Sequence, residues 1–149
     1  MAGDRQQIRR LMIAINRIDE MYYGILRVLG VRGAAFVLFY ALADGRPASQ
    51  KKICQEWAIP KTTLNTLVQE YLQKGYVRLV STGHREKQIV LTQQGAALAQ
   101  RILTPLFCAE QNAMEPFLKT GLAGQMECFA QRLEKEFDKI KREEGMPHV

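Results

Sequence analysis

The chain has 149 residues, of which 47% are hydrophobic and 24% are charged, and its net charge is +6. This composition is typical of a globular protein with one domain. No apolar run reaches the roughly 18 residues that predict a membrane span, and the first residues lack the pattern of a secretion signal, so we expect a cytoplasmic protein.

Residues 5–29 predict one long amphipathic helix. Its apolar residues recur at spacings of three and four, and they are Ile8, Leu11, Met12, Ile15, Ile18, Met21, Tyr22, Ile25 and Leu26. The stripe runs for about five turns, which is longer than a small domain usually covers. We therefore expect this helix to pack on another chain.

A buried helix and a short helix come next. Residues 34–43 (AAFVLFYALA) are apolar nearly all round, which predicts a fully buried helix. Residues 44–47 (DGRP) predict a turn, and Ser49 is a candidate N-cap for a short helix over residues 50–58. The inward residues of the short helix would be Ile53, Cys54 and Trp57.

Residues 59–76 predict a second helix that follows the short one with little slack. Pro60 suits the first turn of a helix, and Gly75 suits its end. The apolar face consists of Leu64, Leu67, Val68, Tyr71 and Leu72. Two short helices with a tight joint predict a helix-turn-helix.

The outward face of this second helix is polar and carries no acid over its first two turns. It consists of Lys61, Thr62, Thr63, Asn65 and Thr66. Hydrogen-bonding groups with one cation are typical of a surface that meets base edges and phosphates. The alternative is the solvated face of an ordinary amphipathic helix.

Two short strands, over residues 76–80 and 88–92, follow the helix-turn-helix. The polar loop between them contains Gly83 and two basic residues, Arg85 and Lys87. A helix-turn-helix followed by a hairpin with a basic tip predicts a winged helix. Arg85 and Lys87 would contact a DNA groove or phosphates, and plain loop charges are the alternative.

The positive charge is concentrated in this middle segment. Residues 46–92 hold eight basic and three acidic side chains, whereas residues 1–45 hold six and four, and residues 93–149 hold seven and eight. Such a distribution is typical of a nucleic-acid footprint, and a solvated basic face is the alternative.

The helical period returns at Gln93 and continues to the C-terminus. The inward residues of the first of these helices are predicted to be Ala97, Leu98, Ile102, Leu106 and Phe107, with Pro105 as a kink. Thr120-Gly121 predicts a joint before a helix over residues 122–142. Its inward residues would be Met126, Phe129, Leu133, Phe137 and Ile140. We expect the tail, residues 143–149, to be frayed.

The first and last helices carry more apolar stripe than the middle of the chain covers. A two-fold homodimer in which these helices interlock would bury them. It would also present two recognition helices to two half-sites.

The order of elements and several strings resemble the MarR (multiple antibiotic resistance regulator) family of transcription factors. The strings are SQKKICQEWAIPKTTLNTLVQEYLQKGYV at Ser49–Val77, IVLTQQG at Ile89–Gly95 and RILTPL at Arg101–Leu106. The resemblance implies a mainly α-helical winged helix-turn-helix with a small β-hairpin wing and a helical dimerisation region. It further implies one domain over residues 1–149, with a DNA-binding lobe at 31–94 and dimerisation helices at 1–30 and 95–149.

The resemblance also implies a function. Members bind palindromic operator DNA as homodimers, often repress nearby genes, and are released by small aromatic or lipophilic effectors. By position, the outward residues of the second helix would enter the major groove and Arg85 the minor groove, with Gln50 and Lys51 near phosphates. The family wing usually has an Asp a few residues before that Arg, and residues 81–84 (STGH) contain no acid.

An effector site between the first helix and the DNA-binding lobe would use aromatic residues. The candidates are Met21, Tyr22, Tyr23, Phe39 and Tyr40, and core or dimer packing is the alternative. A different class of function is a winged helix that docks on a protein and not on DNA.

Few residues have the chemistry of catalysis. The histidines are His84, interpreted as an exposed loop residue with a pH switch as the alternative, and His148. No Ser/His/Asp or Cys/His arrangement and no phosphate-binding glycine loop is visible, so we expect no enzyme and no cofactor. Cys54 is interpreted as a core residue. Cys108 and Cys128 are a possible redox sensor, and no cysteine pair has metal-ligand spacing.

Overall fold

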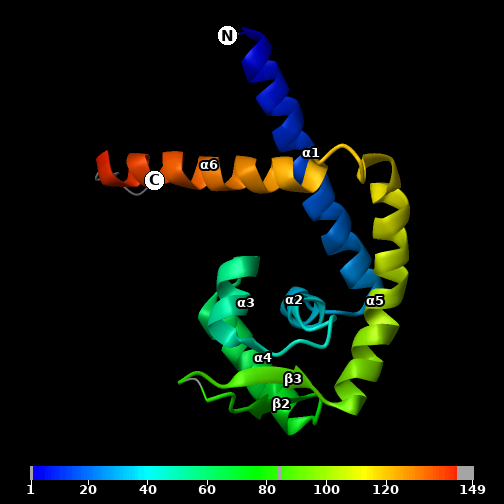
Figure 1. Ribbon diagram of the computed structural model, residues 1–149. Coiled ribbons are helices and arrows are strands. Elements are labelled where there is room, and N and C mark those ends of the chain that lie inside the picture. Colours follow the sequence, from blue (N-terminus) through cyan, green and yellow to red (C-terminus); the bar gives the residue numbers. More distant parts are fainter. Residues whose placement is uncertain (1, 84, 144–149) are drawn as a thin grey trace. The chain divides into compact units, whose positions relative to one another are not determined.

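The computed structural model describes residues 2–83 and 85–143, which belong to two compact units, Met1–Pro105 and Leu106–Val149. In chain order the elements are α1 (Ala2–Leu29), α2 (Gly33–Ala41), β1 (Ala48–Ser49), α3 (Gln50–Trp57), α4 (Lys61–Gln73), β2 (Val77–Val80), β3 (Gln88–Leu91), α5 (Gln93–Met114), the 3-10 helix η1 (Glu115–Phe117) and α6 (Leu122–Glu143) (Figure 1). The mainly helical fold with a small antiparallel sheet confirms the predicted winged-helix class. The predicted functional division at residues 30 and 95 stays a prediction.

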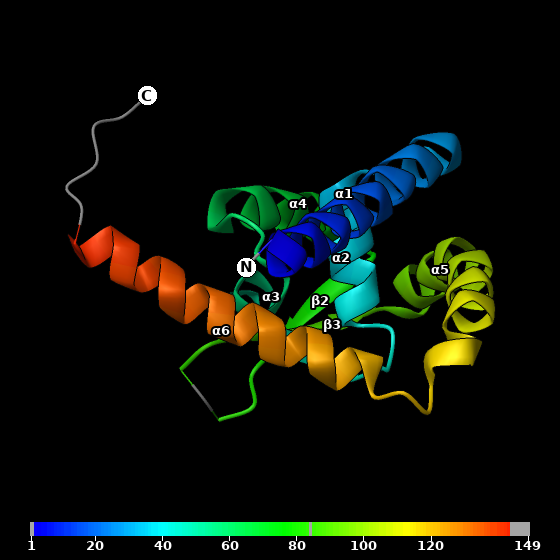
Figure 2. The same cartoon turned by 90° about the horizontal axis from the view of Figure 1, so that it is seen from above.

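The core of the first unit is built around α2. Four of its residues, Ala35, Phe36, Leu38 and Phe39, are buried, whereas Val37 and Tyr40 are half-buried and line a hollow, so the expectation of a fully buried helix is wrong for this side of α2. Figures 1 and 2 show α2 at the centre of this unit, beside α3 and α4. The largest fully buried side chains are Phe39, Leu38, Leu42, Ile53, Leu64, Ile89 and Val68. Burial of each contributes about 1.5–3 kcal/mol, so apolar packing fixes the two short helices and the sheet together.

The wing is a β-hairpin extended by a third short strand. β2 and β3 pair antiparallel with Val77 opposite Leu91, which confirms the predicted hairpin. β1 pairs with the other edge of β3, Ala48 opposite Ile89, and the strand order is β1-β3-β2. β1 was not predicted, because its two residues are too few for an alternating pattern.

A close contact joins the end of α4 to the start of α5. The Thr92 hydroxyl donates to the Gly75 carbonyl at 2.5 Å and accepts from the Gly95 N–H at 3.0 Å. The Thr92 N–H donates to the Tyr76 carbonyl at 3.0 Å. A Cβ atom at Gly95 would lie 1.8 Å from that carbonyl oxygen. Two residues of the Thr-Gln-Gln-Gly string therefore have structural roles. Thr92 caps the start of α5, and Gly95 leaves room for the backbone of Tyr76.

This contact also explains why one inward residue of α5 was predicted wrongly. Ala97 was expected inward and is exposed, whereas Ala99, Leu103 and Leu106 are buried. Docking of Gly95 against Tyr76 sets the rotation of the helix, which the apolar pattern alone placed differently. The helix continues through Pro105 to Met114, as expected.

The second unit ends in α6, which begins after Gly121, a residue with φ of +73°. The predicted inward face of α6 is uncovered toward its end, where Phe137 is 52% and Ile140 47% exposed. Glu143 closes α6, and the rest of the tail that was expected to fray lies outside the described residues.

The apolar stripe of α1 is likewise exposed. Ile8 is 53%, Ile18 50% and Met21 61% exposed.

No single described helix is both long and apolar enough to cross a bilayer, and only one bent pair, Gly3–Leu29 with Gly33–Ala41, reaches that threshold together.

Candidate nucleic-acid interface

Helix α4 has one buried and one exposed face, as its sequence predicts. Leu64, Leu67, Val68 and Tyr71 are buried. The five polar residues expected outward, Lys61, Thr62, Thr63, Asn65 and Thr66, are all exposed. These five residues are called the α4 polar face below.

The beginning of α4 is open. Pro60 was expected in the first turn and is instead the N-cap residue in an extended conformation; its carbonyl accepts from the Leu64 N–H at 3.1 Å. No side chain caps this end, and the first turn has no acid. The unpaired N–H groups and the helix dipole therefore favour an anion at this end.

Helix α3 and a tight turn hold α4 in place. The Ser49 hydroxyl accepts from the Lys52 N–H at 3.2 Å, which confirms Ser49 as the N-cap of α3. Ile53 is fully buried. Ala58 between the helices is left-handed, with φ of +49°. This single residue lets α3 end at Trp57 and α4 start at Lys61, which is the joint of a helix-turn-helix.

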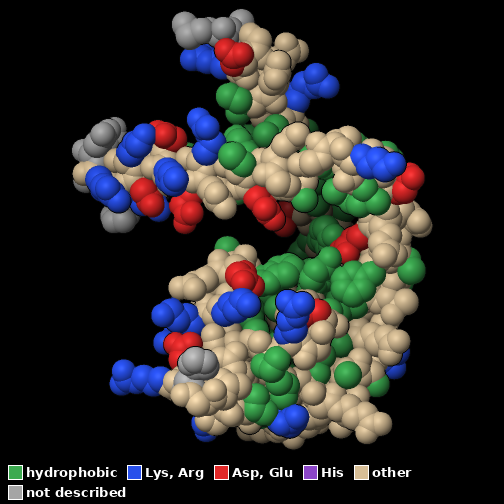
Figure 3. Space-filling model, viewed as in Figure 1, with side chains coloured by type: hydrophobic (Ala, Val, Ile, Leu, Met, Phe, Trp, Pro, Cys, Tyr) green, Lys and Arg blue, Asp and Glu red, His purple; other side chains and the backbone are tan. Residues whose placement is uncertain are grey.

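A hollow of about 590 Å³ lies between α3, the start of α4 and the wing. Five of the nine predicted DNA-contact residues line it, namely Gln50, Lys51, Lys61, Asn65 and Lys87. Figure 3 shows basic side chains gathered over α3 and the wing. The sequence-distant residues are thus brought together on one surface, which we call the basic hollow.

The other four predicted residues lie outside the basic hollow. Thr62, Thr66 and Arg85 are exposed beside it, and Thr63 lines a different hollow formed with α1 and α2. The Thr66 hydroxyl donates to the Thr62 carbonyl at 2.9 Å, so it is engaged with the backbone. His84 lies outside the described residues, so neither interpretation of it is tested.

Several residues that line the basic hollow were not predicted. Gln55 lies four residues after Lys51 on α3, and this helical spacing was a usable signal. Cys54 was interpreted as core but is half-buried and lines the hollow. Glu86 adds one acid to the hollow, and nothing in its sequence context predicted that.

The cations of this surface are free to bind phosphate. Among the described residues, Lys51, Lys61, Arg85 and Lys87 form no ion pair, whereas neighbouring Lys52 lies 3.8 Å from Glu56. Unpaired surface cations retain their full attraction for an anion. The charges of these four residues are therefore not neutralised by ion pairs with other described residues.

A second hollow, of about 930 Å³, lies between α1, α2 and the turn before α4. Aromatic rings line it in a chain of contacts, with centroid distances of 5.7 Å for Tyr22–Phe36, 5.3 Å for Phe36–Tyr40 and 5.1 Å for Tyr40–Trp57. Of the candidate effector residues, Tyr22, Tyr23 and Tyr40 line this aromatic hollow. Phe39 is fully buried and Met21 does not line it.

An ion-pair cluster connects the start of α2 to α4. Glu70 of α4 accepts from Lys74 at 2.6 Å and from Arg32 at 2.8 Å. The Lys74 and Arg32 charges hold the pKa of Glu70 below its usual value, and Glu70 in turn raises the pKa of Lys74. The cluster ties the α1–α2 junction to the helix that carries the polar face.

Residues 29–88 match the MarR family. A MarR family regulator from Neisseria meningitidis is similar in structure, with a TM-score of 0.77 and 21% identity over 89% of this chain and 97% of that chain. A MarR family transcriptional regulator from Listeria monocytogenes, complexed with 26mer DNA, gives a TM-score of 0.62 and 14% identity over 95% and 97%.

The PcaV transcriptional regulator from Streptomyces coelicolor, solved with its natural ligand, gives a TM-score of 0.58 and 13% identity over 81% of this chain and 89% of that chain. No curated protein matches the sequence. The structural likenesses cover most of each chain and establish the winged-helix fold.

Proposed function

We propose that the protein is a DNA-binding transcriptional regulator, because residues 29–88 match the MarR family and the chain has the winged-helix fold of solved members of that family. One observation carries the proposal. The unpaired cations of α3, α4 and the wing converge on the basic hollow, beside the exposed α4 polar face.

In this proposal the α4 polar face enters the major groove. Asn65 offers the paired donor and acceptor that read adenine, and the threonines offer hydroxyls and methyl groups to base edges. Lys51 and Lys61 neutralise phosphates on either side of the groove, and the open start of α4 favours a further phosphate. Arg85 at the wing tip reaches the adjacent minor groove.

The protein acts as a homodimer on a palindromic operator in this proposal. The exposed stripes of α1 and α6 are the supporting observation, since apolar faces of this length are normally covered by a partner. A two-fold pair would carry two α4 helices, and its operator would have matching half-sites.

We further propose that the protein represses nearby genes and is released by an effector in the aromatic hollow. The support is the volume of about 930 Å³ and the row of rings between α1 and α2. Pockets of roughly 300–1,000 Å³ lined by aromatic residues are typical of small-molecule sites.

Fluorescence anisotropy on duplex fragments from beside the protein's own gene tests DNA binding. The parent should bind with an affinity that falls as salt rises, with a log–log slope of about −0.9 per phosphate neutralised. Lys61→Ala and Arg85→Ala should each weaken binding and leave thermal stability nearly unchanged. Lys135→Ala on α6, an exposed lysine that forms no ion pair with any described residue, is the matched control.

Two results would contradict the proposal. If Lys61→Ala and Arg85→Ala bind DNA like the parent, the assigned surface is wrong. If the parent binds no duplex but retains a partner protein at high salt, the winged helix is a protein-docking module, because an apolar protein interface depends little on salt.

A further inference from the structure

Thr66 lies on the exposed side of α4, one turn after Thr62, and its hydroxyl group is already engaged. The hydroxyl donates to the carbonyl oxygen of Thr62, four residues earlier, at 2.9 Å. A threonine hydroxyl has one proton, and here that proton lies in the hydrogen bond to the helix backbone. Thr66 therefore has no donor for a DNA base, and its methyl group is the other group that the side chain can present.

Two neighbours of Thr66 on the α4 polar face offer different chemistry. Thr62 and Asn65 are both exposed, and their side chains make no hydrogen bond to any described residue. The Thr62 hydroxyl and the Asn65 amide are therefore available to donate to base edges and to accept from them. The α4 polar face thus combines two hydrogen-bonding side chains with one, Thr66, whose available group is mainly apolar.

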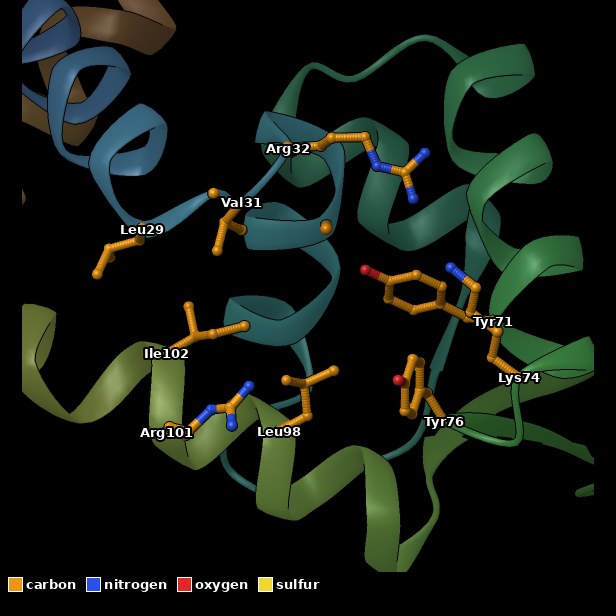
Figure 4. Close-up of a pocket in the computed structure, with 11 residues that line it drawn as sticks. Leu29, Val31, Arg32, Tyr71, Lys74, Tyr76, Leu98, Arg101 and Ile102 are labelled. Atoms are coloured by element: carbon orange, nitrogen blue, oxygen red, sulfur yellow. The ribbon is translucent and has the colours of Figure 1, made fainter.

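Packing on the other side of α4 fixes which side chains face outward. The ring of Tyr71 lies against Phe39, with ring centroids 5.5 Å apart, and against Tyr76, at 5.3 Å. Figure 4 shows the Tyr71 ring directed from α4 toward α2. Tyr71 follows Thr66 by five residues, which is about 140° around a helix. Burial of the Tyr71 ring therefore keeps Thr66 on the outer side of α4.

The composition of α4 favours A·T pairs over G·C pairs as its target. The helix contains no arginine, and its one basic residue, Lys61, stands at its first position. Arginine or lysine paired with guanine is the commonest specific contact in the major groove. Amides instead read adenine, and threonine methyl groups contact the C5-methyl group of thymine. The groups that α4 presents along its outer side match the second kind of contact.

We infer that Thr66 is a specificity-determining residue that recognises one thymine of each half-site through contact between its methyl group and the C5-methyl group of the base. The hydrogen bond to the Thr62 carbonyl holds the side chain in one rotamer, so the hydroxyl positions the methyl group and does not itself contact the base. This inference rests on the proposed function, because it requires α4 to lie in the major groove of DNA.

Deoxyuridine tests the inference directly, since it differs from thymidine only by the absence of the C5-methyl group. Nuclease protection of DNA from beside the protein's own gene first defines the bound duplex. Each protected thymine is then replaced singly by uracil, and fluorescence anisotropy measures the dissociation constant of the full chain for each duplex. The affinity of the parent should fall about fourfold at one thymine of each half-site, the effect expected when one methyl group is lost from an apolar contact.

Two substitutions separate the methyl group of Thr66 from its hydroxyl group. Thr66→Ser keeps the hydroxyl, so it should bind the thymine duplex about fourfold more weakly than the parent and should not respond to uracil at that position. Thr66→Val keeps a methyl group in place of the hydroxyl, so its affinity should still fall about fourfold on the uracil duplex. A response to uracil that persists in Thr66→Ser, or disappears in Thr66→Val, would overturn the inference.

Thr104→Ser is the matched control, because the exposed Thr104 of α5 makes the same kind of hydrogen bond, to the Gln100 carbonyl at 2.7 Å. This variant should bind every duplex like the parent. Circular dichroism should show the same helix content for all three variants, since both threonines are exposed. A parent that binds no duplex would overturn the proposed function and this inference together. Duplex binding without a uracil effect that depends on Thr66 would overturn this inference alone.

Discussion

Asn65 is the residue from which we expect most of the sequence discrimination. It is exposed on α4 and lines the basic hollow together with Lys51 and Lys61. Its amide can donate and accept at one adenine edge, whereas Lys51 offers only a charge. Substitution of these two residues by alanine should therefore affect DNA binding in different ways.

Asn65→Ala should cost about 1–3 kcal/mol on the preferred operator and much less on unrelated DNA. Lys51→Ala should weaken binding to every sequence about equally and reduce the salt slope by about 0.9. Competition anisotropy with operator and scrambled duplexes at several salt concentrations measures both effects. A uniform loss for Asn65→Ala would show that this residue does not read bases.

Ala58 is a residue whose backbone, and not its side chain, matters. Its φ of +49° is accessible to alanine at some cost and much less accessible to a β-branched residue. Ala58→Val should destabilise the fold by about 1–3 kcal/mol. Urea unfolding measures the free energy of unfolding of each variant. Ala58→Gly is the control, because glycine adopts the same φ without strain. If valine and glycine behave alike, the joint between α3 and α4 is not strained.

At the scale of elements, the packing of α5 on the end of α4 depends on the absence of a side chain at Gly95. Gly95→Ala should destabilise by about 1–3 kcal/mol, because the added Cβ meets the Tyr76 carbonyl oxygen. Alanine is otherwise the better helix former by about 1 kcal/mol. Gly124→Ala in α6, where nothing lies within 4 Å, should be neutral or stabilising. Thermal unfolding that ranks the two variants in the opposite order would contradict this packing.

The same element marks the limit of prediction from sequence. The faces of α4 were predicted correctly, since local helical spacing alone separates Leu64, Leu67 and Val68 from their polar neighbours. The rotation of α5 was not, because it depends on the contact of Gly95 with the backbone of Tyr76, which lies 19 residues earlier in the sequence. Cys54 was misplaced for a related reason, as the wing that leaves it half-buried beside the basic hollow is distant in sequence.

The ion-pair cluster between α2 and α4 should make stability depend on pH in one direction. The pKa of Glu70 lies below its ordinary value of 4.5, so the carboxylate stabilises the folded state above that pH, and the contribution is lost as pH falls below it. Glu70→Gln should therefore lower the melting temperature at pH 7 and converge with the parent in acid. Melting curves of both proteins across pH measure this, and a constant difference at all pH values would exclude a charge effect.

At the scale of the whole molecule, the exposed stripes predict the oligomeric state. Phe137 and Ile140 are about half exposed on α6. Phe137→Glu should raise the dissociation constant of the dimer by at least about tenfold, because a charge would replace a ring in an apolar interface. Lys135→Glu, on the opposite side of α6, is the control. Analytical ultracentrifugation measures both, and a parent that sediments as a monomer would contradict the homodimer.

The continuous course of α5 through Pro105 has a mechanical consequence for such an assembly. Pro105 has no N–H to donate to the carbonyl four residues earlier, so α5 lacks one backbone hydrogen bond at this residue. Bending is cheaper there than elsewhere along the helix. In the proposed homodimer, a bend at this proline would allow binding to operators whose two half-sites differ in spacing, which a stiffer helix would not allow.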